Sequence, residues 1–117
     1  AEGEVVQLLA AEKMHCDYCL AAHTMIAQGA GISEEDCIQI RKRHSDDPKT
    51  QALINFTAET LDTYGSVSDE TLAAFMDAGF NPEAAIEVVA GISVLTFTSL
   101  YNHVNNTVVD FPEVAAV

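Results

Sequence analysis

The segment Cys16–His23 (CDYCLAAH) holds the residue types best suited to chemistry. Two cysteines three residues apart, placed where a helix begins, can reach each other to form a disulfide. The N-terminus of a helix also supplies partial positive charge and free N–H groups, which stabilise a thiolate. His23 follows Cys19 by one helical turn and lies on the same face, so it can accept the Cys19 proton. The pattern predicts thiol–disulfide chemistry.

Glu4 is a candidate partner for His23. If the helices before and after Met14-His15 form an antiparallel hairpin, Glu4 and His23 both lie roughly 12–16 Å from the turn, at about 1.5 Å per residue. They would then face each other. A carboxylate beside a histidine fixes the tautomer and orientation of the ring, as in other catalytic triads. We therefore expect a proton relay from Cys19 through His23 to Glu4.

Other interpretations of the cysteines stay open. A buried cysteine is commonly an inert core residue, and we expect Cys37 to be one. A zinc ion could instead use Cys16, Cys19 and His23 as ligands. Its fourth ligand would have to come from Cys37, His15 or His44, and none of these is at a recognised spacing. A thioredoxin-type fold is disfavoured because it needs strands around its CxxC helix.

The remaining histidines and a late polar cluster are given structural roles. We expect His15 to be exposed in a loop and His44 to stabilise the C-terminal end of a helix. The polar cluster follows a long apolar segment and consists of Asn102, His103, Asn105 and Asn106. Helix capping is favoured over a site lining for this cluster.

Helix signals cover nearly the whole chain. Apolar spacing and capping residues predict helices over about 4–13, 17–28, 34–43, 48–64, 69–79 and 82–103, with Ser33, Asp47, Ser68 and Asn81 as N-caps. Basic residues 41–43 suit the negative end of the third helix. No strand alternation, linker or repeat interrupts the 117 residues. We expect a single domain over 1–117, an all-α bundle of about six helices with the CxxC at a helix N-terminus. Beyond Asn105 we expect a tail that docks locally through Phe111-Pro112.

The sixth predicted helix is apolar around almost its whole circumference. Its apolar residues are Ile86, Val88, Val89, Ala90, Ile92, Val94, Leu95, Phe97 and Leu100. A helix of this kind has to be buried on all sides. We favour a homo-oligomer in which a second subunit covers one face. The alternative is a central helix wrapped by the other five.

Composition restricts the partners and the compartment. The net charge of −13 argues against binding to nucleic acid or to anionic membrane surfaces. The longest uncharged segment, Val88–Val109, contains the polar cluster, so we expect no membrane span. Three cysteines do not suit a secreted disulfide scaffold, and the first residues lack the features of a signal peptide. We therefore expect a reducing, cytoplasmic location. No flavin, haem or nucleotide motif indicates a cofactor.

These residues resemble a known signature. Glu4, followed after eleven intervening residues by CDYCLAAH, is similar to the signature of the carboxymuconolactone decarboxylase superfamily, in its alkylhydroperoxidase D-like branch. The stretches DPKTQALINF and AFMDAGFNPEAAIEVVAGISVLTFTSLYNH are also similar, so the resemblance covers nearly the whole chain. Decarboxylases of the superfamily lack the cysteine pair, which favours the redox branch.

The resemblance implies an all-helical fold that assembles as trimers or hexamers. It also implies a peroxidase that reduces hydroperoxides with thiols, or an electron relay to a peroxiredoxin. Cys19 would be the attacking cysteine and Cys16 the resolving one, with His23 and Glu4 as the proton relay. The founding member has a further histidine where this chain has Tyr18, which could donate a proton but is a poor base at neutral pH. The resemblance suggests a lipoylated protein or a thioredoxin-like protein as the electron donor.

Two functions of other classes stay open. The same fold could serve as a non-enzymatic module that senses redox state or carries an interaction surface. It could also be a decarboxylase or isomerase of the superfamily, which would use His23 and Glu4 without thiol chemistry.

Overall fold

Six helices and no strands make up the chain in the computed structural model, which describes residues 1–117. The helices are α1 (Glu2–Lys13), α2 (Asp17–Gly29), α3 (Glu34–Arg41), α4 (Pro48–Thr63), α5 (Asp69–Asp77) and α6 (Pro82–Asn105). The expected all-α bundle is confirmed, and the CxxC lies at the start of α2.

Four of the six helices have the N-caps that the sequence predicts. The side chains of Ser33, Asp47, Ser68 and Asn81 each accept a hydrogen bond from a backbone N–H in the first turn of α3, α4, α5 and α6. Such caps satisfy N–H groups that have no partner inside the helix. Local sequence therefore determines where these helices start.

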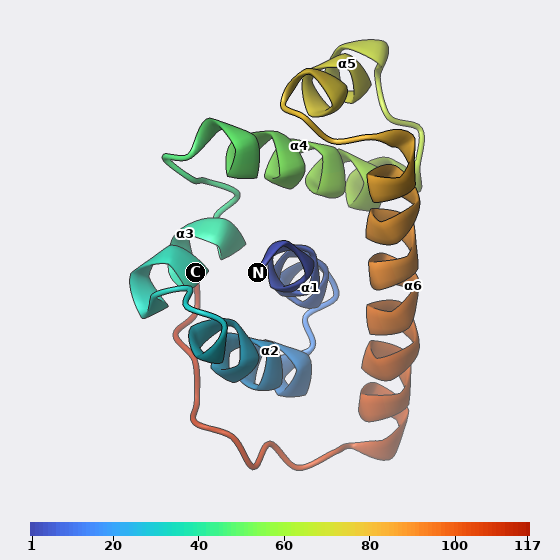
Figure 1. The fold of residues 1–117 in the computed structure, drawn as a ribbon. Coiled ribbons are helices and arrows are strands. Elements are labelled where there is room, and N and C mark those ends of the chain that lie inside the picture. The colour runs from blue at the N-terminus through green and yellow to red at the C-terminus, as the bar shows by residue number, and fades with distance from the viewer.

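The central element is α1, which packs against α2, α3, α4 and α6 (Figure 1). Its residues Leu8, Ala10 and Ala11 are completely buried. The contact with α6 is close because Gly91 has no side chain: a Cβ there would lie 3.2 Å from Nε2 of Gln7 and 3.3 Å from Cγ1 of Val6. The amide of Gln7 donates a hydrogen bond to the Gly91 carbonyl at 2.9 Å. The alternative of a central sixth helix is therefore wrong.

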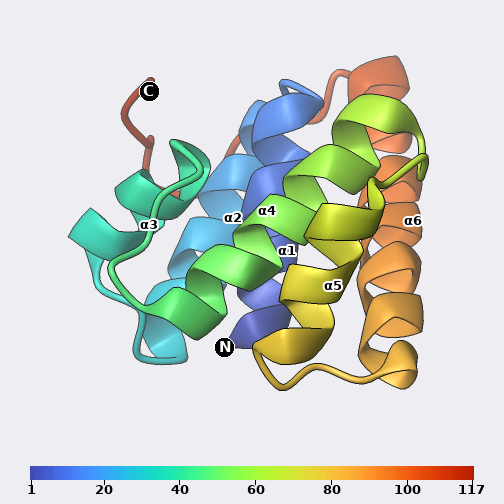
Figure 2. The ribbon, with the colours of Figure 1, turned by 90° about the horizontal axis from the view of Figure 1, so that it is seen from above.

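The outer helix is α6, at the edge of the bundle in both views (Figures 1 and 2). Only Val88, Leu95 and Ser99 of α6 are buried. Its outward face exposes Ile86, Val89, Val94, Phe97, Leu100, Tyr101 and Val104. No other helix presents so long an apolar face to solvent, so this is the surface that a second subunit would have to cover.

By length and composition, α6 also qualifies as a candidate membrane span. It has 24 residues and a mean hydropathy of 1.6 in its most apolar window, 17% of which is buried. This differs from the expectation that no segment qualifies, which rests on the uncharged segment from Val88, whereas the helix already begins at Pro82. One such helix is weak evidence for a membrane protein.

The end of α3 differs from the sequence prediction. The helix stops at Arg41, and Arg43 adopts a positive φ of 68°. Arg41 is buried, and its Nε donates to Glu12 of α1 at 2.8 Å. Arg43 binds both carboxylate oxygens of Asp62 in α4. These arginines therefore join α3 to α1 and α4, rather than serving only the helix dipole.

The tail begins after α6, as expected, but it does not dock locally. It turns back beneath α2 towards α3 (Figure 1). The ring of Phe111 packs edge-on against Tyr18, with centroids 5.5 Å apart. Further along, residues 112–115 line a small pocket together with residues of α2 and α3. The tail therefore covers the side of the bundle that carries the cysteine pair.

Candidate functional site

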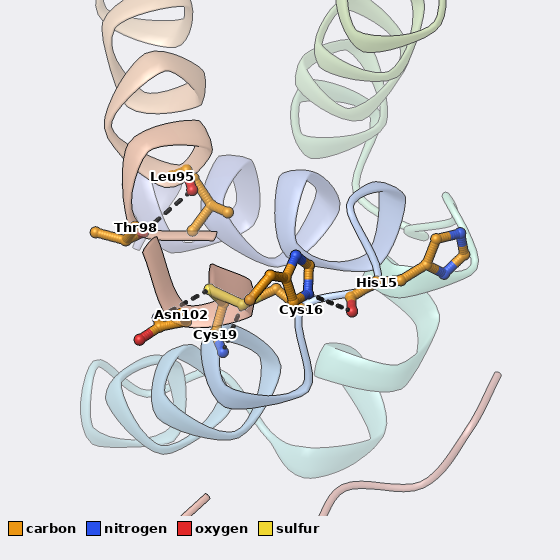
Figure 3. The surroundings of a disulfide bond; sticks show 7 residues. His15, Cys16, Cys19, Leu95, Thr98 and Asn102 are labelled. Atoms are coloured by element: carbon orange, nitrogen blue, oxygen red, sulfur yellow. Dashed lines mark hydrogen bonds between the residues drawn. A yellow bond between two sulfur atoms is a disulfide. The ribbon is translucent and has the colours of Figure 1, made fainter. Parts of the chain in front are cut away.

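A disulfide joins Cys16 and Cys19 at the start of α2 (Figure 3). Cys16 is the N-cap of the helix, and its Sγ accepts a hydrogen bond from the Cys19 backbone N–H at 3.2 Å. Their Cα atoms are 5.2 Å apart, within the usual range for a disulfide. Both residues are almost fully buried. The expected pairing is present, while its reversibility stays a prediction.

Glu4 of α1 and His23 of α2 form the second pair of the site. Nδ1 of His23 is 2.7 Å from Oε1 of Glu4, and both side chains are largely buried. A carboxylate can only accept, so Nδ1 carries the proton and donates it. In the neutral ring, Nε2 is then unprotonated and free to act as a base. The hairpin of α1 and α2 therefore brings together the two residues that the sequence analysis paired.

Cys19 links the disulfide to the Glu4–His23 pair. Within α2 it is one turn before His23, a spacing at which side chains are neighbours on one face. Burial keeps Cys19 away from solvent, so few groups can exchange protons with it. His23 is the titratable residue that follows Cys19 by one turn on this face of α2. The arrangement can pass a proton from Cys19 to His23 while Glu4 holds the ring.

Two residues from the far end of the chain complete the surroundings of the disulfide, although the sequence favours helix capping for both. Nδ2 of Asn102 points at Sγ of Cys19 at 3.9 Å (Figure 3). Nε2 of His103 donates to the carbonyl of His15 at 3.1 Å. Both residues therefore line the site, and the preference for capping was wrong for them. Only Asn106, with a positive φ of 51°, has the capping position.

One signal could have identified Asn102. The buried residues Val88, Leu95 and Ser99 lie seven and four positions apart, which defines one stripe of α6. Continuing this stripe by three positions leads to Asn102. A polar side chain on an inward-facing stripe needs a partner inside the protein. That partner is Cys19.

A pocket of about 280 Å³ opens beside the disulfide. It lies between the start of α2, the end of α6 and the first residues of the tail. His15 is exposed, as expected, and lines the pocket together with Cys16 and Tyr18. The hydroxyl of Tyr18 makes no hydrogen bond, and its ring is held by Phe111. Tyr18 is therefore at the mouth of the site, and its role as a proton donor stays a prediction.

The third cysteine is separate from the site. Cys37 is free and buried in α3. Burial, together with the carboxylates of Asp36 and Glu34, raises the pKa of the Cys37 thiol, although Arg41 acts in the opposite direction. A thiol with a raised pKa is a poor nucleophile at neutral pH. Cys37 is thus a core residue, as expected.

The zinc site considered as an alternative for this segment has no geometric support. No group of three or more His, Cys, Asp or Glu side chains is arranged to hold a metal ion. The zinc site considered from sequence would need Cys16 and Cys19 as separate thiolates, whereas here they are bonded to each other. His44 contacts Asp46 at 3.1 Å, outside the cysteine site.

The comparisons with known proteins assign no family. No protein-family model matches the chain, and no curated protein matches it. The geometry of the cysteine site and the resemblance of its motif therefore remain the basis for assigning a function.

Proposed function

We propose that this chain is a thiol-dependent hydroperoxide reductase similar to the alkylhydroperoxidase D-like proteins. The observation that supports it most directly is the Cys16–Cys19 disulfide at a helix start, with the Glu4–His23 pair one turn further along. A structural disulfide has no need of a base beside it. A disulfide that is made and broken in each turnover does, because thiols must lose and regain protons.

In the oxidative half of the cycle, Cys19 reacts as the thiolate. It attacks the terminal oxygen of the hydroperoxide, the O–O bond breaks, and the alkoxide leaves with the electron pair. Cys19 becomes a sulfenic acid. The thiolate of Cys16 then attacks Sγ of Cys19, and hydroxide leaves and is protonated to water. The products are one alcohol, one water and the disulfide.

The proton relay supports the first step. Nε2 of His23 takes the Cys19 proton and returns it to the departing alkoxide. Because Nδ1 donates to Glu4, the positive charge that develops on the ring lies beside a carboxylate. General acid–base assistance of this kind is typically worth about 10²–10⁴-fold in rate.

In the reductive half, a dithiol donor restores the two thiols and leaves as a disulfide. A lipoylated protein or a thioredoxin-like protein fits this requirement. The acidic surface, with a net charge of −13, would disfavour donors of strongly negative charge. No further cofactor is needed for the cycle.

The assembly is part of the proposal. The exposed apolar face of α6 fits a contact with a second copy of the chain, in a homo-oligomer that the resemblance implies to be a trimer or hexamer. An obligate interface of this kind commonly buries more than roughly 2,000 Å². In this account α6 is buried in protein rather than in lipid, and the chain is cytoplasmic.

The test is peroxide-dependent oxidation of a supplied dithiol, followed over many turnovers. Wild type should turn over, and Cys19→Ser should be inactive. Cys37→Ser is the matched control and should keep the wild-type rate. A single oxidation of the cysteine pair without turnover would indicate a redox sensor. Thiols that never react with peroxide would favour the decarboxylase or isomerase alternative.

A further inference from the structure

We propose that the reducing thiol attacks Sγ of Cys16, through the pocket between α2 and α6, and that Asn102 receives the Cys19 thiolate released in this step. The inference rests on the proposed function only in requiring a disulfide that can be reduced. It assigns the two sulfurs different roles towards the donor and gives Asn102 a role in positioning the leaving sulfur.

The pocket distinguishes the two cysteines, although both are almost fully buried, with 1% of Cys16 and 3% of Cys19 exposed. Cys16 is among the residues that line it, and Cys19 is not. The other walls come from the turn before α2 and from α6, through His15, Asp17 and His103. A donor that enters here therefore meets Cys16 first.

The burial of Cys16 limits the kind of donor. The residue keeps only 1% of its surface exposed, and the pocket has a volume of about 280 Å³. A cysteine embedded in the flat surface of a folded protein could not bring its sulfur into such a space, which argues against the thioredoxin-like class of donor. A slim thiol can, either as a small molecule or at the end of a flexible arm.

Asn102 supplies a donor to Cys19 as the leaving group. Its Nδ2 lies 3.9 Å from Cys19 Sγ, and the backbone N–H of Cys19 donates to Cys16 Sγ at 3.2 Å, so each sulfur has a donor of its own. A disulfide sulfur is a weak acceptor, whereas a thiolate forms a charge-assisted hydrogen bond that is roughly twice as strong as a neutral one. The contact therefore strengthens as negative charge develops on Cys19.

The step balances as a thiol–disulfide exchange. The donor thiolate forms a bond to Cys16 Sγ, and the Cys16–Cys19 bond breaks with its electron pair on Cys19. A second thiol of the donor then attacks the donor sulfur of the mixed disulfide, so that Cys16 leaves as a thiolate. The donor is oxidised to a disulfide, and its two protons end on Cys16 and Cys19. This order regenerates the attacking residue, Cys19, in the first step.

The direct experiment maps the mixed disulfide. Oxidised full-length protein is mixed with 2-mercaptoethanol, quenched with N-ethylmaleimide during the first turnover, and digested for fragment mass spectrometry. We expect the mercaptoethanol adduct on Cys16 and the maleimide on Cys19, in at least about tenfold excess over the reverse. An adduct chiefly on Cys19, or evenly divided, would overturn the inference.

The role of Asn102 is tested by a pH profile. In reduced Asn102→Leu, the Cys19 thiolate loses its donor, so alkylation of Cys19 at pH 7 should be about tenfold slower and its profile should move to higher pH. Asn105→Leu, near the same end of α6 and outside the pocket, is the control and should match wild type. Asn102→Gln should restore part of the rate. An unchanged profile in Asn102→Leu would remove Asn102 from the step.

These outcomes are separable from the proposed function. The mapping experiment requires no peroxide. A Cys16 adduct in a protein that shows no peroxidase turnover would therefore support attack at Cys16 and contradict the proposed peroxidase activity. Peroxidase turnover together with a Cys19 adduct would do the opposite.

Discussion

His23 and Glu4 are 19 positions apart in the sequence, yet Nδ1 of His23 lies 2.7 Å from Oε1 of Glu4. The pair is possible because only residues 14–16 separate α1 from α2, so the two helices fold back on each other. The same short turn sets Cys16 at the first position before α2. One hairpin thus positions both the disulfide and the proposed proton relay.

The charge of Glu4 should matter more than its hydrogen bond. In Glu4→Gln the side-chain oxygen still accepts from Nδ1 of His23, but the ring loses its anionic partner. We expect alkylation of reduced Cys19 to slow by about 10²-fold at neutral pH, with the fold intact. The measurement is the rate of alkylation between pH 5 and 9. Glu2→Gln, an exposed neighbour in the same turn, is the control, and an equal effect in both variants would contradict the relay.

The tail should control access to the disulfide. Phe111→Ala removes the edge-on contact with Tyr18 and should loosen the segment that covers the mouth of the pocket. We expect faster reduction of the disulfide by a small thiol, by about three- to tenfold, measured by the release of free thiols. Val108→Ala changes an exposed tail residue and should leave the rate unchanged. A slower rate in Phe111→Ala would contradict this role.

The apolar face of α6 should mediate assembly. Phe97 is 72% exposed in a single chain, and Phe97→Asp would bury an unpaired charge in any contact formed there. We expect the variant to dissociate to a mass near 12.5 kDa in light scattering, while wild type is larger. Tyr64→Asp alters a 98% exposed residue outside α6 and should retain the wild-type mass. Wild type at the mass of one chain would contradict the assembly.

Asp62 should make stability sensitive to acid. Hydrogen bonds from Arg43 and then Lys13, together with their charges, hold the pKa of its carboxyl well below the usual range. A lowered folded-state pKa gives stability that is present above the unfolded pKa, near 3.8, and is lost as the pH falls below it. The side chain is 37% exposed, so we expect Asp62→Asn to cost only about 1 kcal/mol at pH 7. The difference in free energy of unfolding, measured with urea, should shrink towards pH 2, and a constant difference would contradict this.

The sequence predicts the features of this fold that depend on neighbouring residues. The N-caps and the hairpin that joins Glu4 to His23 follow from local spacing, because a cap or a helical turn involves residues only a few positions apart. The same is true of the cysteine pair, whose members belong to one turn of α2.

The features that the sequence did not predict depend on residues far apart in the chain. Asn102 reaches Cys19 from 83 positions away, and the partners of Arg41 and Arg43 lie on other helices. The central place of α1 follows from small residues such as Ala10 and Ala11, which allow other helices to approach from several sides. Apolar periodicity identifies α6 as an apolar helix but does not show which helices pack against it. From the sequence alone, α6 could therefore lie at the centre or at the edge of the bundle.

The thiol chemistry proposed for Cys16 and Cys19 is tested most directly by the mass of the protein after one oxidation. Fully reduced protein is mixed with one equivalent of hydroperoxide, quenched with N-ethylmaleimide and examined by mass spectrometry. We expect Cys16 and Cys19 to become linked and to escape the reagent, Cys37 to stay a thiol after denaturation, and one alcohol to form per disulfide. A link that includes Cys37, or a protein that keeps all three thiols in the presence of hydroperoxide, would contradict the central claim.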